Sequence, residues 1–184
     1  IGLCVHKMIG DRVDEGKIIS RGYLAVDITT KIGKVYKWME EQIPILMAQA
    51  LQSLSEKPDY YIEDTITQMD RQSLRCYPRM PEDGKIDWKQ SNMEILRLIN
   101  ASGPPFIGAF CQFEEKTMHI MDAELEDDDE EFFAVPGQIL KLNNDNTVTI
   151  ACGVGKIVLK EIRLNGDSTN RVSDILNSTR KRLR

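Results

Sequence analysis

The chain has 184 residues, of which 41% are hydrophobic and 29% are charged, and a formal net charge of −5 at pH 7. This composition is typical of a soluble globular protein with one large or two small domains. The negative charge argues against a general nucleic-acid binder, because such proteins carry a basic field. No apolar run approaches the roughly 18 residues that span a bilayer, and no signal peptide is apparent, so we expect a cytoplasmic protein without a membrane contact.

The four cysteines lie far apart in the sequence. They are Cys4, Cys76, Cys111 and Cys152, and the chain has only two histidines. No pair of cysteines has the spacing of a metal site or of a small disulfide framework. The pattern therefore predicts buried free thiols and no bound metal.

The first residues predict two strands joined by a polar loop. An apolar run around Val5 is followed by a loop that carries Asp14 and Gly16, and β-branched residues resume at Ile18. Loops held by a rigid sheet often present catalytic and binding groups, so Asp14 is a candidate functional residue. Gly16 lets the backbone turn sharply or approach a ligand closely. On these residues alone, an ordinary hairpin turn remains the alternative.

A helix and then a linker are predicted next. Apolar residues recur at helical spacing between Ile32 and Leu54, which is typical of a helix packed on a sheet. Pro44 is expected to end or kink this helix, because proline lacks the N–H group that a helix interior uses. The polar, proline-bracketed segment 55–81 indicates a linker, with a short helix near residues 64–74.

A second helix is predicted to begin at Ser91. Glu94 follows three residues later, so the two side chains can cap the free amides of the first turn reciprocally. The sequence Gly103-Pro104-Pro105 then forces a rigid corner before a strand at 109–113.

The remainder predicts a small barrel or a curled sheet of about five short strands. Gly153 and Gly155 fit a phosphate cradle less well than a turn between strands, because no helix follows them. The acidic run 124–131 predicts a solvated loop. Residues 174–181 are predicted to form a short helix, and the basic tail 180–184 is predicted to be a frayed end. The strands are expected at 109–113, 117–121, 134–140, 147–150 and 156–164.

Four stretches resemble the folate-dependent formyltransferases, the family that includes methionyl-tRNA and amino-sugar N-formyltransferases. They occur in the order of that family and reach across nearly the whole chain. The loop between His6 and Asp14 is one residue longer than the common pattern. The first is Val5-His6-x-Met8 with Asp14-Glu15-Gly16-Lys17-Ile18-Ile19, and the second is 76–88, which ends in Ile86-Asp87-Trp88. The third is 100–110, which contains Gly103-Pro104-Pro105, and the fourth combines Val135-Pro136-Gly137-Gln138-Ile139-Leu140 with 149–159, which contains Ala151-Cys152-Gly153-Val154-Gly155.

The resemblance implies a fold and a division into domains. Residues 1–57 would be the C-terminal part of the catalytic domain, an α/β fragment containing its last strands and a helix. Residues 58–81 would be the linker. Residues 82–184 would form the small, mostly β C-terminal domain, an open barrel similar to an OB-fold.

The resemblance also implies an activity and a site. The activity is transfer of a formyl group from 10-formyltetrahydrofolate to a primary amine. Asp14 would be the third member of an Asn-His-Asp catalytic set, and Val13, Glu15, Gly16 and Lys17 would contact the pterin. The family's Asn and His lie upstream of this loop, and His6 matches a different position, so we expect the 184 residues alone to be inactive.

The amine that is formylated is open between two substrates. The acidic run 124–131 disfavours binding of initiator methionyl-tRNA, so a nucleotide-linked amino sugar is preferred and methionyl-tRNA is the alternative. A third reading is a non-enzymatic module that binds RNA or a protein. Such a module would interleave aromatic and basic residues on its strands, whereas Phe132 and Phe133 lie among acidic residues. A homodimer also remains open.

Overall fold

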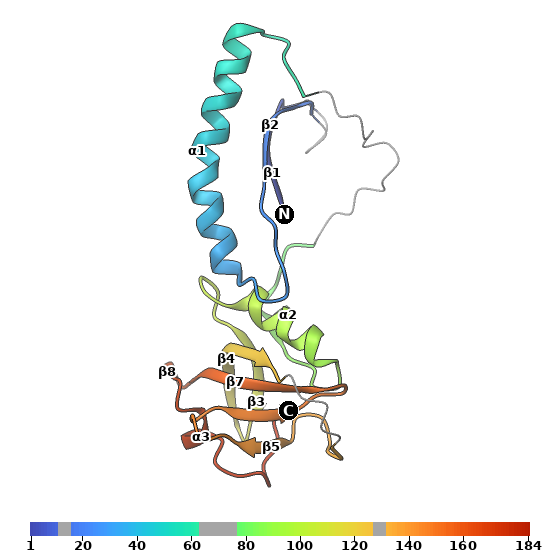
Figure 1. Cartoon of the computed structure of the whole chain (residues 1–184), viewed down its shortest axis with the longest axis vertical. Coiled ribbons are helices and arrows are strands. Elements are labelled where there is room, and N and C mark those ends of the chain that lie inside the picture. Colours follow the sequence, from blue (N-terminus) through green and yellow to red (C-terminus); the bar gives the residue numbers. More distant parts are fainter. Residues whose placement is uncertain (11–15, 63–76, 127–131) are drawn as a thin grey trace. The chain divides into compact units, whose positions relative to one another are not determined.

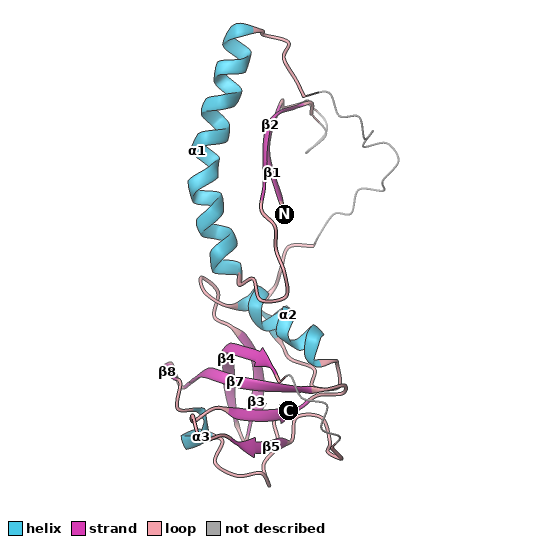
Figure 2. Cartoon of the chain, viewed as in Figure 1, coloured by secondary structure: helices cyan, strands magenta, loops and turns pink. Residues whose placement is uncertain are grey.

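The protein is described by a computed structural model that contains two compact units, each mixing helix and strand (Figures 1 and 2). Unit 1 comprises residues 1–26 and 34–78, and unit 2 comprises residues 27–33 and 79–184. The residues that the structure describes are 1–10, 16–62, 77–126 and 132–184. The helix predicted near residues 64–74 lies outside them.

Unit 1 is a two-stranded hairpin with a long helix beside it (Figure 1). The strands β1 (Gly2–His6) and β2 (Ile18–Tyr23) are antiparallel, and the helix α1 spans Ile32–Glu56. The Ser20 hydroxyl on β2 donates a hydrogen bond of 2.8 Å to the carbonyl of Leu46 on α1. A side chain in place of Gly22 would contact Leu46 and Trp38, so α1 packs directly on β2 as expected.

Of the two effects expected of Pro44, the end of the helix is wrong, because α1 continues through this residue, while the kink stays a prediction. A proline in a helix interior removes one hydrogen bond and costs about 3 kcal/mol. The buried residues Val35, Leu46 and Ala50 lie on both sides of it. Tertiary packing of the two halves thus outweighs the local cost, which is how most helices in proteins are stabilised.

Residues 27–33, which follow β2 in the chain, belong to unit 2. The buried Asn100 donates from Nδ2 to the carbonyl of Ile28 at 2.8 Å. Lys31 Nζ lies 2.8 Å from Asp122 Oδ1 on a strand of the same unit. This segment is therefore fixed to unit 2 by a side chain from a helix and by one from the sheet.

The helix α2 (Asn92–Ser102) begins as predicted. The Glu94 amide donates to Ser91 Oγ at 3.3 Å, and the Ser91 amide donates to Glu94 Oε2 at 3.0 Å, which is a reciprocal cap. The short 3₁₀ helix η2 (Pro81–Gly84) precedes it. The apolar face of α2 is buried at Ile95, Leu96 and Ile99.

Unit 2 is mostly β, with a sheet in the order β3-β4-β7-β6-β5 and with β8 paired to β7. All of these pairs are antiparallel, and β4 carries two register shifts near Asp122, which bend a strand and increase its twist. The core lies between the sheet and α2 and includes Met118, Ile120, Ile150 and Leu159. The strands are β3 (Ala109–Phe113), β4 (Lys116–Leu125), β5 (Ile139–Leu142), β6 (Val148–Ala151), β7 (Lys156–Leu164) and β8 (Asp167–Thr169).

The glycines at 153 and 155 form the turn between β6 and β7, as predicted. A Cβ atom on Gly153 would lie 1.7 Å from the carbonyl oxygen of Lys89. The Gly153 amide donates to the carbonyl of Gln90 at 2.9 Å. This amide is thus used to hold the turn against the segment before α2.

The C-terminal residues lie between the two edges of the sheet, so the prediction of a frayed tail is wrong. Arg184 exchanges two backbone hydrogen bonds with Gln112 of β3, at 2.6 and 2.8 Å. Leu183 donates to the carbonyl of Gly137 beside β5 at 2.8 Å, and its side chain is 1% exposed. No strand pair among the described residues joins β3 to β5, so a closed OB-like barrel is not confirmed.

Several predicted boundaries differ from the structure, and β4, for example, continues to Leu125 instead of ending at residue 121. The strand β5 begins at Ile139 instead of residue 134, because Val135 and Gln138 close a turn with a hydrogen bond of 3.0 Å. The last helix, α3, spans Val172–Ile175 instead of 174–181. The chain leaves the helical path after it because Leu176 and Leu183 both enter the core.

We expect Leu183→Ala to lower the free energy of unfolding by about 2 to 5 kcal/mol, since it removes a fully buried side chain. The matched control is Leu142→Ala, at a side chain that is 38% exposed. Urea denaturation at a constant m value would measure both. Equal shifts in the two midpoints would show that the tail does not contribute to the core.

Candidate functional site

The base of the loop that carries Asp14 is formed by the ends of β1 and β2. The amide of Lys7 donates to the carbonyl of Lys17 at 3.0 Å, which continues the pairing of the hairpin. The register shifts between Val5 and His6, and such a bulge twists a strand locally. The two ends of the loop are therefore held together by the backbone.

Gly16 closes the loop at a point where no side chain fits. It is buried, and a Cβ atom on it would lie 1.5 Å from the carbonyl oxygen of Lys7. This separation is far below any van der Waals contact, so a side chain would push the two strands apart. The close approach predicted for Gly16 is made to the neighbouring strand of the protein.

A segment remote in the sequence supports the same loop base. Lys17 Nζ lies 3.8 Å from the centroid of the Tyr61 ring, which is a cation–π contact. The Ile62 amide donates to the carbonyl of Ile18 at 2.8 Å, and Lys7 Nζ donates to the carbonyl of Pro58 at 3.1 Å. Tyr61 was not predicted, because no spacing in the sequence connects it with Lys17.

Three of the five predicted site residues lie outside the described residues. They are Asp14, Val13 and Glu15, so their assignment stays a prediction. The structure places Gly16 and Lys17 at the closing end of the loop. Both are engaged with the protein itself, Gly16 by its backbone approach and Lys17 by its contact with Tyr61.

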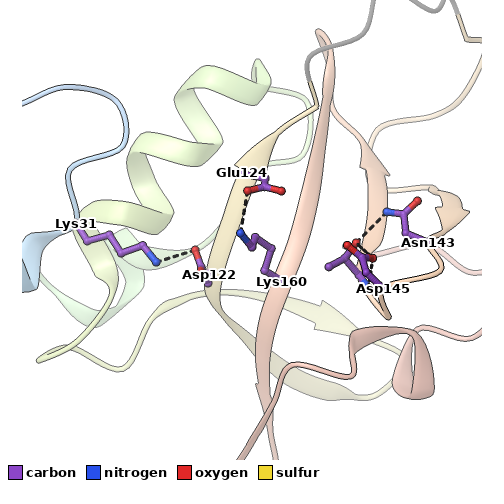
Figure 3. A network of polar contacts seen from close by, with 7 residues as sticks. Lys31, Asp122, Glu124, Asn143, Asp145 and Lys160 are labelled. Atoms are coloured by element: carbon purple, nitrogen blue, oxygen red, sulfur yellow. Dashed lines mark hydrogen bonds and ion pairs between the residues drawn. The ribbon is translucent and has the colours of Figure 1, made fainter.

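Unit 2 carries a separate polar network on its sheet (Figure 3). Lys160 Nζ lies 2.9 Å from Glu124 Oε2, and this hydrogen bond raises the pKa of Lys160. Hydrogen bonds from Thr147 lower the pKa of Asp145. The side chains of Lys160 and Glu124 are about half exposed to solvent, and exposed ion pairs contribute little to stability. The arrangement is that of a surface network, and Glu124 belongs to β4 instead of the predicted loop.

Two kinds of feature are absent from the part of the chain that the structure describes. No group of three or more His, Cys, Asp or Glu side chains there could hold a metal ion. No helix in the same residues combines the length and the apolar composition needed to cross a bilayer.

The cysteines agree with the prediction in two of the three described cases. Cys111 and Cys152 are buried and free, and burial raises the pKa of each thiol to about 12. Cys4 is exposed, so the prediction of burial is wrong there, because its strand lies in a two-stranded hairpin with little cover. Cys76 lies outside the described residues.

The family follows from a comparison of sequences. Residues 79–180, more than half of the chain, match the family described as "Formyl transferase, C-terminal domain". The chain belongs to this family. The family predicted from the sequence is thus confirmed, and the match covers the sheet of unit 2 with its flanking helices.

The sequence similarity of this formyl transferase chain to known proteins extends beyond the C-terminal domain. A methionyl-tRNA formyltransferase of Lachnospira eligens is 29% identical over 171 residues, which are 90% of this chain and 51% of that protein. The bifunctional polymyxin resistance protein ArnA of Wigglesworthia glossinidia brevipalpis is 28% identical over 151 residues, 82% of this chain and 21% of that protein. The chain spans about half the length of two methionyl-tRNA formyltransferases that it matches, that of Lachnospira eligens and that of Acetivibrio thermocellus.

Solved structures show the same fold. A variant of HypX from Aquifex aeolicus superposes with a TM-score of 0.64 at 18% identity, over 97% of this chain and 31% of HypX. HypX in complex with tetrahydrofolic acid superposes with a TM-score of 0.63 over 92% of this chain and 29% of HypX. At this identity the likeness establishes the fold only.

We expect Gly16→Ala to open the base of the loop. The new methyl group would collide with the carbonyl of Lys7 and lengthen the hydrogen bond from the Lys7 amide to Lys17. Amide hydrogen exchange at Lys7 should then accelerate by about tenfold or more, because local protection reports local opening. The control is Gly10→Ala, where a Cβ atom would have no neighbour within 4 Å. Similar exchange in both variants would disprove the constraint.

We expect only Cys4 to react with a thiol reagent at pH 8 in the folded Cys76→Ser variant. With a pKa of about 12, about one in ten thousand molecules carries the thiolate at Cys111 or Cys152. Counting modified thiols before and after unfolding would measure this. Modification of three thiols in the folded chain would contradict it.

The same pKa shifts give a pH dependence of stability. The folded pKa lies above the unfolded one, so the unfolded chain loses these protons first as the pH rises. Each buried thiol therefore contributes stability below about pH 9 that is lost progressively toward pH 12. Urea midpoints should fall over this range, and Cys152→Ser should reduce the fall.

Proposed function

We propose that this chain is the C-terminal portion of a formyltransferase that uses 10-formyltetrahydrofolate as its formyl donor. The observation that carries the proposal is the extent of the similarity to methionyl-tRNA formyltransferase, which covers 90% of this chain and so goes beyond the C-terminal domain. HypX with bound tetrahydrofolic acid shares the fold, which supports a folate as the donor.

Exposed apolar residues on unit 1 support the proposal that unit 1 is one part of a larger domain. The helix α1 has Ile43, Met47 and Leu51 about half exposed, at spacings that place them along one side. Met8 and Tyr23 of the hairpin are largely exposed as well. A hairpin of two strands is marginally stable alone, and exposed apolar residues in a row commonly mark a surface that another segment covers.

The proposed domains follow from this view. Residues 1–57 belong to the catalytic domain, residues 58–81 link the domains, and residues 82–184 form an OB-like C-terminal domain. The preceding part of the protein would supply the Asn and the His of the catalytic set, so the 184 residues are inactive alone.

Asp14 is the proposed catalytic residue of this chain. Its carboxylate would orient the histidine of the preceding part or pass a proton through an ordered water, while the asparagine binds the developing oxyanion. Val13, Glu15, Gly16 and Lys17 would line the pterin side. The contacts at Gly16 and Tyr61 support a loop whose base is rigid, and such rigidity positions a reacting group.

A nucleotide-linked amino sugar is the proposed acceptor. The acidic residues of 124–131 in the C-terminal domain would repel a phosphate backbone, and ArnA is among the relatives. Initiator methionyl-tRNA is the second candidate, because methionyl-tRNA formyltransferases are among the most similar relatives. The third alternative, a non-enzymatic binding module, is not represented among the relatives named above.

We expect Asp14→Asn to lower kcat of the longer protein by about 10²-fold or more, since proton transfer typically contributes that much. The protein would include the sequence encoded upstream of Ile1. Formylation of a nucleotide-linked amino sugar and of methionyl-tRNA would be compared with 10-formyltetrahydrofolate as donor.

The matched control is Asp11→Asn, which changes the same group in the same loop and should leave kcat unchanged. Circular dichroism would check that both variants are folded. Turnover of Asp14→Asn close to that of the unchanged protein would refute the role of Asp14. Turnover of methionyl-tRNA alone would refute the sugar substrate and keep the reaction class.

A further inference from the structure

Unit 2 has a groove that none of the preceding roles uses. Its volume is about 460 Å³, which lies in the range of small-molecule sites. It is lined by two segments, 85–89 and 182–184, which we call its first and second wall, and by Pro136. The groove belongs to unit 2 throughout, whereas the Asp14 loop belongs to unit 1.

Both walls alternate buried and exposed residues. In the first wall Ile86 and Trp88 are buried, and the charged residues that alternate with them are exposed. In the second wall only Leu183 is buried. Both walls are hydrogen-bonded to the same strand, since Ile86 donates to Phe110 at 2.8 Å and Arg184 donates to Gln112 at 2.8 Å. The exposed side chains therefore project from a fixed backbone.

The groove is lined by four cations and one carboxylate. The cations are Lys85, Lys89, Arg182 and Arg184, and the salt bridges of the described residues involve none of them. The carboxylate of Asp87 accepts the amide of Lys89 at 3.0 Å. This excess of positive charge is local, because the chain as a whole carries −5.

Arg182 is held in an orientation that leaves most of its donors available. Its Nε donates to the carbonyl of Pro136 at 2.8 Å. A guanidinium has five N–H donors in a planar fork, so four remain after this bond. Such a fork matches the oxygens of a phosphate, and lysine ammonium groups add point charges.

We propose that this groove binds the diphosphate of a small molecule, such as a nucleoside diphosphate. Cations of both walls line the same groove and can contact the two phosphates of one ligand. The volume suits a ligand of this size. The inference concerns residues of unit 2 alone and does not depend on formyl transfer.

The same lining disfavours a nucleic acid. Single strands need exposed aromatic rings on which bases stack. The one ring in the lining is Trp88, which is 4% exposed.

The test is isothermal titration of the 184-residue chain with UDP and with inorganic pyrophosphate. The variant Lys85→Gln/Lys89→Gln removes two exposed lysines and should weaken binding of both probes at least tenfold. Arg182→Gln is a second variant of the opposite wall. The matched control is Lys34→Gln/Lys37→Gln, which removes the same charge from exposed positions of α1 and should leave binding unchanged. Urea midpoints would confirm that each variant is folded.

Three results would overturn the proposal. The first is no binding of either probe at low salt. The second is equal weakening by the groove variant and the control variant, which would show a general charge effect. The third is binding of an RNA hairpin through the groove without binding of pyrophosphate. That result would show that the groove is a nucleic-acid surface.

Discussion

The C-terminal residues place a buried leucine and two sets of backbone hydrogen bonds between the edges of the sheet in unit 2. Arg184 pairs with Gln112 of β3, and Leu183 pairs with Gly137 before β5. Edge strands leave unpaired backbone groups, and covering them satisfies those groups and closes the core beneath. The position of the tail also creates one wall of the basic groove. The packing of the sheet and the charge of its surface thus depend on the same residues.

Unit 1 is governed by a different constraint, the contact of Gly16 with the backbone of Lys7. It brings the ends of the Asp14 loop together, and the segment that contains Tyr61 holds them from the side. The hairpin and helix bury few residues otherwise, with Ile19, Val35, Leu46 and Ala50 as their apolar core. A rigid loop base in a unit with a small core is consistent with a site completed by another part of a formyltransferase.

Unit 2 uses its charges in two different ways. On the sheet of unit 2, Lys160 and Glu124 form an exposed pair, and Lys31 of the segment 27–33 pairs with the partly exposed Asp122. Such pairs orient surface side chains and contribute little free energy. The cations of the groove have no such partners among the described salt bridges. An excess of one charge in a concave site attracts a ligand of the opposite charge.

The sequence by itself determined the features that local chemistry controls. It predicted the cap formed by Ser91 and Glu94, the strand 109–113 and the turn at Gly153, because each depends on residues close together in the chain. It predicted the family from the order of several stretches along the chain. Only the tertiary structure decided that α1 continues through Pro44, that Tyr61 contacts Lys17, and that the tail enters the core. These outcomes depend on contacts between remote segments, whose energies override local preference and leave no periodic pattern in the sequence.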